Sequence, residues 1–275
     1  MKMKNKLVIM ITGASGGLGR ELAIQLAKKG HDVFACTRSP HKIKAFLKKQ
    51  NLFLKNLTPL KLDLVKPKSA KIVYDYILKK AERVDVLVNN AGYGLIGSVE
   101  SLLPAQLKKL FAINFFGAVR CLQAVLPSMR KQKSGLIINI SSTSGLFGSP
   151  LLGGYCASKF ALEGLSECLA MELKKYHVRV KVVEPGLLKS RFIKNIEIGT
   201  RLKPKDNPYL DETRESVKRI RGLLVSKKAE KLAEAAKIVV QEIEDDHKTF
   251  RVQTGDWAKK VVTRKLKEPV LLISK

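Results

Sequence analysis

The sequence predicts an α/β fold, a doubly wound parallel sheet flanked by helices, from two observations. Short apolar runs of strand length alternate with longer stretches of helical periodicity along most of the 275 residues. A glycine-rich turn, residues 12–19, joins the first apolar run to the first helical stretch. Such alternation implies parallel strands joined by right-handed crossover helices. We expect one domain over residues 1–275, because no internal repeat or second core is apparent.

The first strand is expected over residues 6–11, a continuous apolar run. The helix after the glycine turn has apolar residues at helical spacing and closes at Gly30. Glycines let a backbone approach a pyrophosphate, and a helix N-terminus offers it unpaired N–H groups. The spacing G-x-x-x-G-x-G differs from the common G-x-G-x-x-G, and glycine-rich turns also occur as plain tight connections.

The second strand, residues 32–37, ends at Thr37-Arg38. In dinucleotide-binding units the residue that ends this strand meets the adenosine ribose, and an acid there holds the 2′-hydroxyl. Here a hydroxyl and a guanidinium replace the acid, which favours a 2′-phosphate and therefore NADP(H) over NAD(H). The alternative is that Arg38 is an ordinary surface arginine.

Four further apolar runs are expected to be strands, at residues 57–62, 84–88, 136–140 and 178–183. Helical patterns between and after them cover 69–82, 104–131 and 155–176. Polar or small residues follow each run, including Asp63, Asn90, Ser142 and Gly186. Open α/β sheets bind ligands outside the carboxyl ends of their strands. We therefore expect these residues to lie around one ligand-binding edge.

Tyr155 and Lys159 are four residues apart, so on a helix they share one face. A tyrosine with a pKa near 10 is a poor proton donor or acceptor at neutral pH. A nearby ammonium should lower the pKa of the phenol and make it a usable general acid/base. Ser142, 13 residues before Tyr155, could hold the oxygen of an alcohol or carbonyl. An isolated Y-x-x-x-K is more often a core tyrosine with a surface lysine.

Asn114 interrupts the apolar pattern of the helix expected at 104–131. Asparagine is a poor residue for a helix interior, and a buried amide needs hydrogen-bond partners. A structural role and a catalytic role are equally open for it on these grounds.

The part of the chain after the sixth strand follows a different pattern. Residues 187–225 lose the apolar periodicity, and their position favours a substrate lid. A helix is expected at 227–243 and a short strand at 250–253. Residues 257–266 form a basic amphipathic segment, which can lie on a membrane surface but more often packs on its own domain or on a neighbouring subunit.

Composition adds a formal net charge of +28, from 52 Lys and Arg against 24 Asp and Glu. This could indicate nucleic acid or an anionic membrane. The basic residues are spread along the chain without a recognisable nucleic-acid module, so we expect solvated side chains and no specific nucleic acid. The four cysteines show neither zinc nor disulfide spacing, so no metal is expected and a reduced cytoplasmic location is the default. No apolar run approaches the length of a membrane span.

Seven motifs together resemble the short-chain dehydrogenase/reductase family. They are T-G-A-S-G-G-L-G at 12–19, D-L at 63–64, N-N-A-G at 89–92, the asparagine at 114, S-S at 141–142, Y-C-A-S-K at 155–159 and P-G at 185–186. The likeness covers about residues 6–190 in the expected order. It implies a Rossmann-type sheet, a nicotinamide cofactor and hydride transfer at a carbon that bears oxygen.

The resemblance also implies roles for individual residues. Tyr155 would be the general acid/base, Ser142 would bind the substrate oxygen, Lys159 would hold the nicotinamide ribose and lower the pKa of Tyr155, and Asn114 would hold a water of the proton relay. The residues expected to bind the cofactor are Gly13, Ser15, Gly17, Leu18, Gly19, Arg38, Asp63, Asn90, Ala91, Gly92, Tyr155, Lys159, Pro185, Gly186 and Ser190. Ser190 stands where many members have threonine.

The carboxyl-terminal part looks like the hydroxysteroid and retinol dehydrogenase branch. The apolar residues between the serine and the tyrosine, Leu146, Phe147, Leu151 and Leu152, would give a pocket an apolar wall. We therefore expect a hydrophobic alcohol, ketone or aldehyde as substrate. The alternative is a non-catalytic NADP(H)-binding regulatory protein on the same fold. Family members are commonly homodimers or homotetramers built on the helices expected at 104–131 and 155–176.

Overall fold

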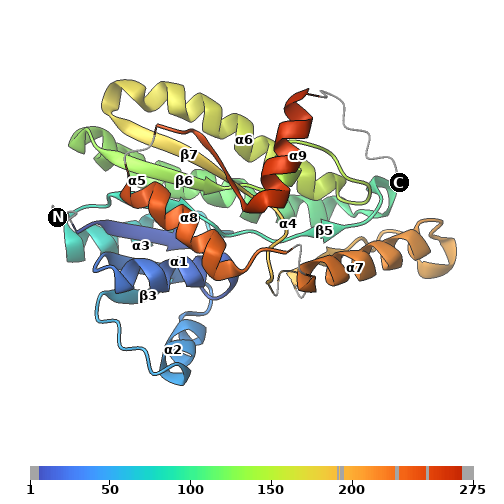
Figure 1. Ribbon diagram of the computed structural model, residues 1–275, viewed down its shortest axis with the longest axis horizontal. Coiled ribbons are helices and arrows are strands. Elements are labelled where there is room, and N and C mark those ends of the chain that lie inside the picture. The colour runs from blue at the N-terminus through green and yellow to red at the C-terminus, as the bar shows by residue number, and fades with distance from the viewer. Residues whose placement is uncertain (1–5, 191, 193–194, 227–228, 246–247, 268–275) are drawn as a thin grey trace.

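The computed structural model describes residues 6–190, 192, 195–226, 229–245 and 248–267 (Figure 1). Its centre is a sheet of seven parallel strands in the order β3-β2-β1-β4-β6-β7-β9. These strands are β1 (Val8–Thr12), β2 (Asp32–Thr37), β3 (Leu57–Lys61), β4 (Val86–Asn89), β6 (Gly135–Ile140), β7 (Val178–Pro185) and β9 (Arg251–Thr254). The strand order reverses between β1 and β4, so the carboxyl ends of these strands flank the crevice where such sheets bind ligands.

Both faces of the sheet are covered by helices, because side chains alternate between the faces along each strand. Ile9 and Ile11 of β1 lie in one core with α1 (Gly17–Lys28) and α8 (Leu232–Glu244), which are side by side in Figure 1. Val8 and Met10 lie in the other core with α3 (Ser69–Ala81), α5 (Phe116–Gln132) and α6 (Gly153–Leu173). The predicted doubly wound α/β fold is confirmed.

The helix expected at 104–131 is divided at Phe115 into α4 (Pro104–Asn114) and α5. Together, Pro104–Gln132 is the one described stretch that is long and apolar enough to cross a membrane by length and composition. Val125 and Met129 are buried in the core against the sheet, and Arg120 donates to the carbonyl oxygen of Leu64. These contacts are those of a core helix in this domain.

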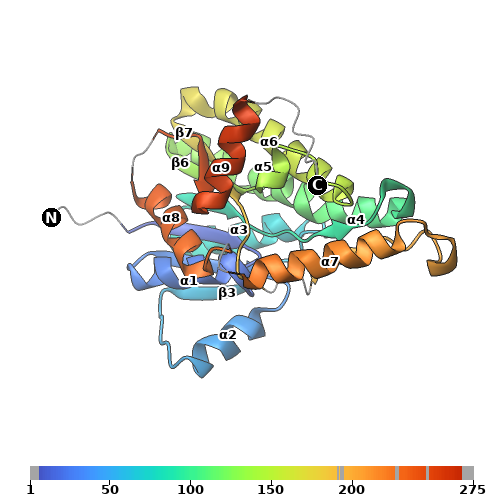
Figure 2. The ribbon, with the colours of Figure 1, turned by 45° about the vertical axis from the view of Figure 1, so that its right-hand side comes forward.

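Other elements also differ from the sequence expectation. Residues 187–225 were expected to be a lid without apolar periodicity, and within them α7 (Leu210–Val225) is a helix that extends from the body of the molecule (Figure 2). Charged residues dominate this helix, and only Thr213, Ser216 and Leu224 of it are buried. The helix α2 (Pro40–Lys49) and the two-residue strands β5 (Leu95–Ile96) and β8 (Glu197–Ile198), which pair with each other, were not expected at all.

The helix expected at 227–243 begins at Leu232, and residues 227–228 lie outside the described residues. The segment expected to be basic and amphipathic is α9 (Gly255–Lys267). Ala258 and Val262 of α9 are buried, and Trp257 packs so closely on Gly186 that a Cβ there would lie 2.7 Å from its ring. The helix therefore packs on its own domain.

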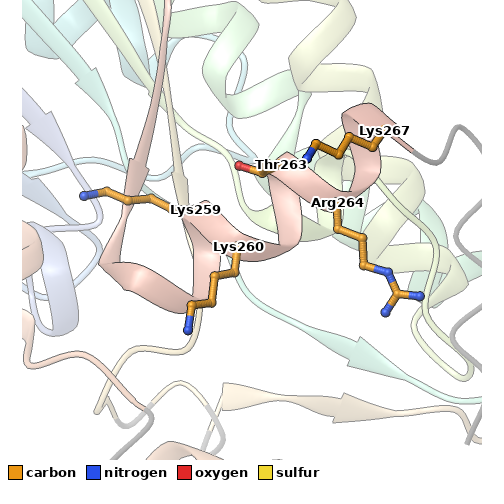
Figure 3. Close-up of a pocket in the computed structure, with 5 residues that line it drawn as sticks. All are labelled: Lys259, Lys260, Thr263, Arg264 and Lys267. Atoms are coloured by element: carbon orange, nitrogen blue, oxygen red, sulfur yellow. The ribbon is translucent and has the colours of Figure 1, made fainter.

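The opposite face of α9 is charged. Lys259, Lys260 and Arg264 project from the helix, and Thr263 and Lys267 lie on the same surface (Figure 3). Between Asp256 and Lys267 this helix contains no acidic residue.

Five non-glycine residues among those described have positive φ angles. Asn51, Glu82, Lys133 and His177 (φ 48–62°) follow α2, α3, α5 and the short 3₁₀ helix Lys174–Tyr176. Each of these four begins a connection to the amino end of the next sheet strand. The fifth, Leu151 (φ 64°), lies in the loop between Ser142 and Tyr155.

Candidate active site

Tyr155, Lys159 and Ser142 come together at the carboxyl end of β6. Ser142 follows this strand, and the first turns of α6 place Tyr155 and Lys159 on one helix face. The Nζ atom of Lys159 lies 6.0 Å from the centre of the Tyr155 ring and donates to the carbonyl oxygen of Ile140 at 2.8 Å. Ser142 is hydrogen-bonded to the Tyr155 side chain. The structure thus brings the three expected residues to one place.

Burial controls the ionisation of this group. It raises the pKa of Tyr155 to about 12, against which the Ser142 hydrogen bond acts in the lowering direction. Burial lowers the pKa of Lys159 to about 8, while the Glu163 carboxylate acts to raise it. The expectation of a lowered pKa for Tyr155 is therefore wrong for this structure, because the loss of hydration outweighs the effects that act in the lowering direction. Loss of hydration is the largest influence on the Tyr155 phenol, whose ring centre lies 6.0 Å from the Lys159 ammonium.

Asn114 lies at the end of α4 and holds two elements of the site together. Its side chain accepts a hydrogen bond from the Tyr93 backbone N–H and donates to the Tyr93 carbonyl oxygen, both at 3.0 Å. It also donates to Ser158 Oγ at 3.1 Å. With 1% of its surface exposed, the amide is bonded to protein partners, which fits the structural role that the sequence left open.

The glycine turn is shaped by close backbone approaches. Gly13 (φ 69°) approaches Ala91 so closely that a Cβ would lie 2.8 Å from the Ala91 Cα. At Gly19 a Cβ would lie 2.3 Å from Asn90 Nδ2, which donates to the Thr12 carbonyl oxygen at 2.9 Å. Gly17 (φ 55°) begins α1 and has no heavy atom within 4 Å of its Cβ position.

This geometry fits a dinucleotide phosphate. Open space beside Gly17 and the N–H groups of the first turn of α1 form a cradle for an anion. Asn90 braces this turn with its side chain, and Leu18 is buried in the core, so only its backbone is available to a ligand. Ala91 donates its N–H to the Thr12 hydroxyl at 3.0 Å.

The adenosine side of the expected site is more open. Arg38 is exposed at the end of β2, and Ser15 is half-buried in the glycine turn. Burial and Glu197 raise the pKa of Tyr93 to about 12, with the Arg38 guanidinium acting in the lowering direction. The positive charge of Arg38 therefore acts on Tyr93, which follows the carboxyl end of β4. Asp63 is half-buried, and its carboxylate accepts the Val65 N–H at 3.2 Å.

The remaining expected residues line the site from β4 and β7. A Cβ on the exposed Gly92 would lie 3.6 Å from Lys159 Nζ, so this glycine adjoins the ammonium. Pro185 is buried at the end of β7, and Gly186 follows it against α9. Ser190 is half-buried, and its hydroxyl accepts the Phe192 N–H at 3.2 Å.

Phe192 is a site residue that the sequence did not indicate. Its ring packs edge-on against Tyr155 at 5.9 Å between ring centres. It also lies 3.1 Å from the position of a Cβ on Gly94, which adjoins β5. Its only signal in the sequence was its place in the expected lid.

The comparisons with known proteins agree with this arrangement. A family model described as short chain dehydrogenase matches residues 7–200. The chain belongs to the short-chain dehydrogenase/reductase family. It is an oxidoreductase of the short-chain dehydrogenase/reductase type, and the motifs that resembled the family in sequence lie at the carboxyl ends of the expected strands and on the helices that follow them.

Two relatives and one solved structure represent the similarities within the short-chain dehydrogenase/reductase family. The chain is 38% identical over 211 residues to 3-ketodihydrosphingosine reductase of Bacteroides thetaiotaomicron, covering 77% of this chain and 74% of the relative. It is 42% identical over 188 residues to human retinol dehydrogenase 8, covering 67% of this chain and 60% of the relative. A short-chain dehydrogenase from Streptomyces avermitilis has a TM-score of 0.84 at 28% identity, over 97% of this chain and 94% of that one. The expected likeness to the retinol dehydrogenase branch is confirmed.

Proposed function

We propose that this protein is an NADP(H)-dependent oxidoreductase that interconverts a hydrophobic alcohol with its ketone or aldehyde. The observation that carries the proposal is the convergence of Tyr155, Ser142 and Lys159 beside the open glycine turn. A proton donor (Tyr155), a hydroxyl that can bind the substrate oxygen (Ser142) and a cation (Lys159) then lie next to a binding site for a dinucleotide. A non-catalytic binding protein would have no need of this combination.

The residues of the chain supply the proton and the charge stabilisation. With its pKa raised to about 12, Tyr155 is protonated at neutral pH and suited to donate a proton to a carbonyl oxygen that gains charge. The Ser142 hydroxyl donates a hydrogen bond to the same oxygen, and the Lys159 ammonium favours the tyrosinate left behind. Bound NADP(H) would supply or accept the hydride at the substrate carbon. In oxidation the proton moves the other way, from the alcohol to Tyr155.

Cofactor selection is assigned to the adenosine side. Gly13, Gly17 and the first turn of α1 would hold the pyrophosphate, with Asn90 bracing the turn. A guanidinium forms bidentate hydrogen bonds with phosphate. Arg38, supported by Ser15, would therefore hold the 2′-phosphate of NADP(H), because no acid ends β2 to hold a free 2′-hydroxyl.

The hydrophobic substrate class rests on the residues around Tyr155. Phe192 packs on the Tyr155 ring, Ile196 lies 3.0 Å from the Cβ position of Gly94, and Phe147 is buried nearby in sequence. Leu146, Leu151 and Leu152 are half-buried in the loop before α6. Two relatives are named for retinol and 3-ketodihydrosphingosine, which are both largely hydrocarbon molecules.

Exposed side chains and free cysteines of the protein support proposals about its partners and its cellular location. Exposed Phe116 on α5 and exposed Phe160 and Met171 on α6 support a homodimer or homotetramer built on these helices. The charged outer face of α9 suits peripheral contact with an anionic membrane (Figure 3). The described cysteines are free thiols, which suits the proposed cytoplasmic location.

Cofactor titration tests the proposal first. We expect purified protein to bind NADPH more tightly than NADH, and Arg38→Ala to weaken NADPH binding by about tenfold, the loss of about 1.4 kcal/mol expected for a partly exposed charged hydrogen bond. The NADH affinity of Arg38→Ala should stay unchanged, which makes NADH the internal control. Equal binding of both cofactors by the wild type would contradict the 2′-phosphate assignment, and binding of neither would contradict the proposed function.

A further inference from the structure

A buried carboxylate lies one helical turn beyond Lys159. Glu163 is four residues on in α6, so it shares the helix face of Lys159, and 4% of its surface is exposed. The two side chains also meet the same strand end, because Lys159 donates to Ile140 and Glu163 lies beside the Ser141 hydroxyl. Gly145 closes over this contact: a Cβ there would lie 2.6 Å from Ser141 Oγ and 3.1 Å from Glu163 Oε1.

Glu163 is anchored from a distant part of the chain. Arg251, the first residue of β9, donates through Nη1 to Glu163 Oε2 at 2.5 Å and to Glu184 Oε1 at 2.6 Å. The same guanidinium binds the exposed Glu167 through Nη2. Glu184 is fully buried at the end of β7, and its second oxygen accepts from Gln253 at 2.7 Å.

The charges of this cluster do not balance around Arg251 alone. Glu163 and Glu184 are two buried carboxylates, Glu167 adds a third at the rim, and one guanidinium contacts all three. A buried charge without compensation is costly. Lys159 is a second buried cation beside this group, and Glu163 is the carboxylate that shares its helix face.

We propose that Glu163 is a positioning residue, the counter-charge of the Lys159 ammonium, and that Arg251 holds it in place from β9. Strand β9 follows α8 and immediately precedes α9. The carboxyl-terminal segment and the catalytic helix are therefore joined through one ionic network behind the site. The consequence for catalysis rests on the proposed function, since it concerns the lysine assigned to the reaction.

The groups around Lys159 and Glu163 determine how loss of the Glu163 carboxylate would change the protonation of Lys159. Lys159 is faced by Tyr155 and Glu163 on its own helix, by Asn114 of α4 across Gly92, and by the Ile140 carbonyl of β6. Glu163 is faced by Ser141, Glu184 and Arg251 as well as by Lys159. Burial lowers the pKa of Lys159 to about 8, and Glu163 opposes this. Without the carboxylate, Lys159 should lose its proton at lower pH.

The pH at which Lys159 loses its proton can be measured by NMR of the full chain with its lysines labelled with ¹³C at Cε. The measurement needs neither cofactor nor substrate. The Lys159 signal is identified by its loss in Lys159→Arg, and it should titrate well below ordinary lysines near pH 10.4. In Glu163→Gln we expect its midpoint to fall by about one pH unit, as for loss of an adjacent opposite charge. Glu167→Gln is the matched control, because it removes a partner of the same guanidinium at an exposed position and should leave the midpoint unchanged.

Kinetics form the second arm of the test. The alkaline limb of kcat for NADPH-dependent carbonyl reduction should move to lower pH in Glu163→Gln and stay in place in Glu167→Gln and Glu163→Asp, which keeps the charge. Unchanged Lys159 titration in folded Glu163→Gln overturns the inference, whatever the turnover. If Glu163→Gln does not fold, Glu163→Met gives the same comparison with a neutral side chain. Absence of all turnover in the wild type contradicts the proposed function instead, while the NMR result still decides the role of Glu163.

Discussion

Tyr155 is the side chain on which the proposed chemistry depends most directly. Tyr155→Phe keeps the ring against Phe192 but removes the proton donor, so we expect kcat for carbonyl reduction to fall by about 10²–10⁴-fold. The dissociation constant for NADPH, measured by fluorescence titration, should not change. Tyr76→Phe, at an exposed position on α3, is the control. Undiminished turnover in Tyr155→Phe would show that another group donates the proton.

The identities of these residues could be predicted from sequence, but their ionisation could not. The spacing of Tyr155 and Lys159 fixes a shared helix face whatever the rest of the fold does. Their pKa values depend on burial by segments far away in sequence, and burial moves both groups away from their charged forms. The bracing role of Asn90 was likewise hidden, because it depends on the approach of β4 to the turn after β1.

At the scale of elements, the segment after β7 is fastened over the site at two places. β8 pairs with β5, and Lys189 N donates to the Glu230 carbonyl oxygen at 2.8 Å. Between these fastenings Phe192 reaches the Tyr155 ring. The approach is possible because Gly94 has no side chain: a Cβ there would lie 3.0–3.1 Å from Ile196 and Phe192. The segment can therefore contact a substrate at the catalytic tyrosine.

Phe192→Ala tests this contact. Loss of one buried aromatic contact should raise KM for an apolar ketone by about tenfold, or about 1.4 kcal/mol, with a smaller effect on kcat. Phe192→Leu should retain most of the affinity because it retains apolar volume, and Phe53→Ala, on a fully solvated ring, should have no effect. Equal losses for an apolar ketone and a short polar one, measured by steady-state kinetics, would argue against an apolar contact.

The strands of the sheet were the elements best predicted from sequence. Strands buried on both faces appear as continuous apolar runs, and β2 occupies the expected residues 32–37. The pairing of β5 with β8 joins residues 95–96 to 197–198, so no local pattern encodes it. The helix α7 was missed for a related reason: it buries only three residues, so charge dominates its sequence.

On the scale of the whole molecule, a buried ion pair joins the sheet to helix α8. Lys181 of β7 is 2% exposed and forms a salt bridge with Glu242 of α8. It lies on the face of the sheet that also carries Val183 against α8. Glu242 therefore neutralises a buried cation between the sheet and α8. This ion pair helps to hold α8 on the sheet.

Glu242→Ala should lower the free energy of unfolding by about 3–5 kcal/mol, because it leaves the Lys181 ammonium buried without this partner. Urea unfolding followed by circular dichroism measures the change. Asp75→Ala, which breaks the exposed pair with Lys71 on α3, should cost less than about 1 kcal/mol. The double variant Lys181→Met/Glu242→Leu should recover most of the loss, and failure to do so would show that Glu242 acts through contacts other than Lys181.

The two edges of the sheet differ in how well they should tolerate substitution of residues with a left-handed backbone conformation. Asn51, Glu82, Lys133 and His177 all precede the amino ends of sheet strands, which lie opposite the edge that carries the site. Glycine at such a position relieves about 1–2 kcal/mol of backbone strain against about 0.5–1 kcal/mol lost to chain entropy. Leu151 holds the same conformation beside the site, where strain is more often part of function. Glycine substitutions at the four positions away from the site should therefore raise the thermal stability of the enzyme. They would leave the edge of the sheet that carries the active site unchanged.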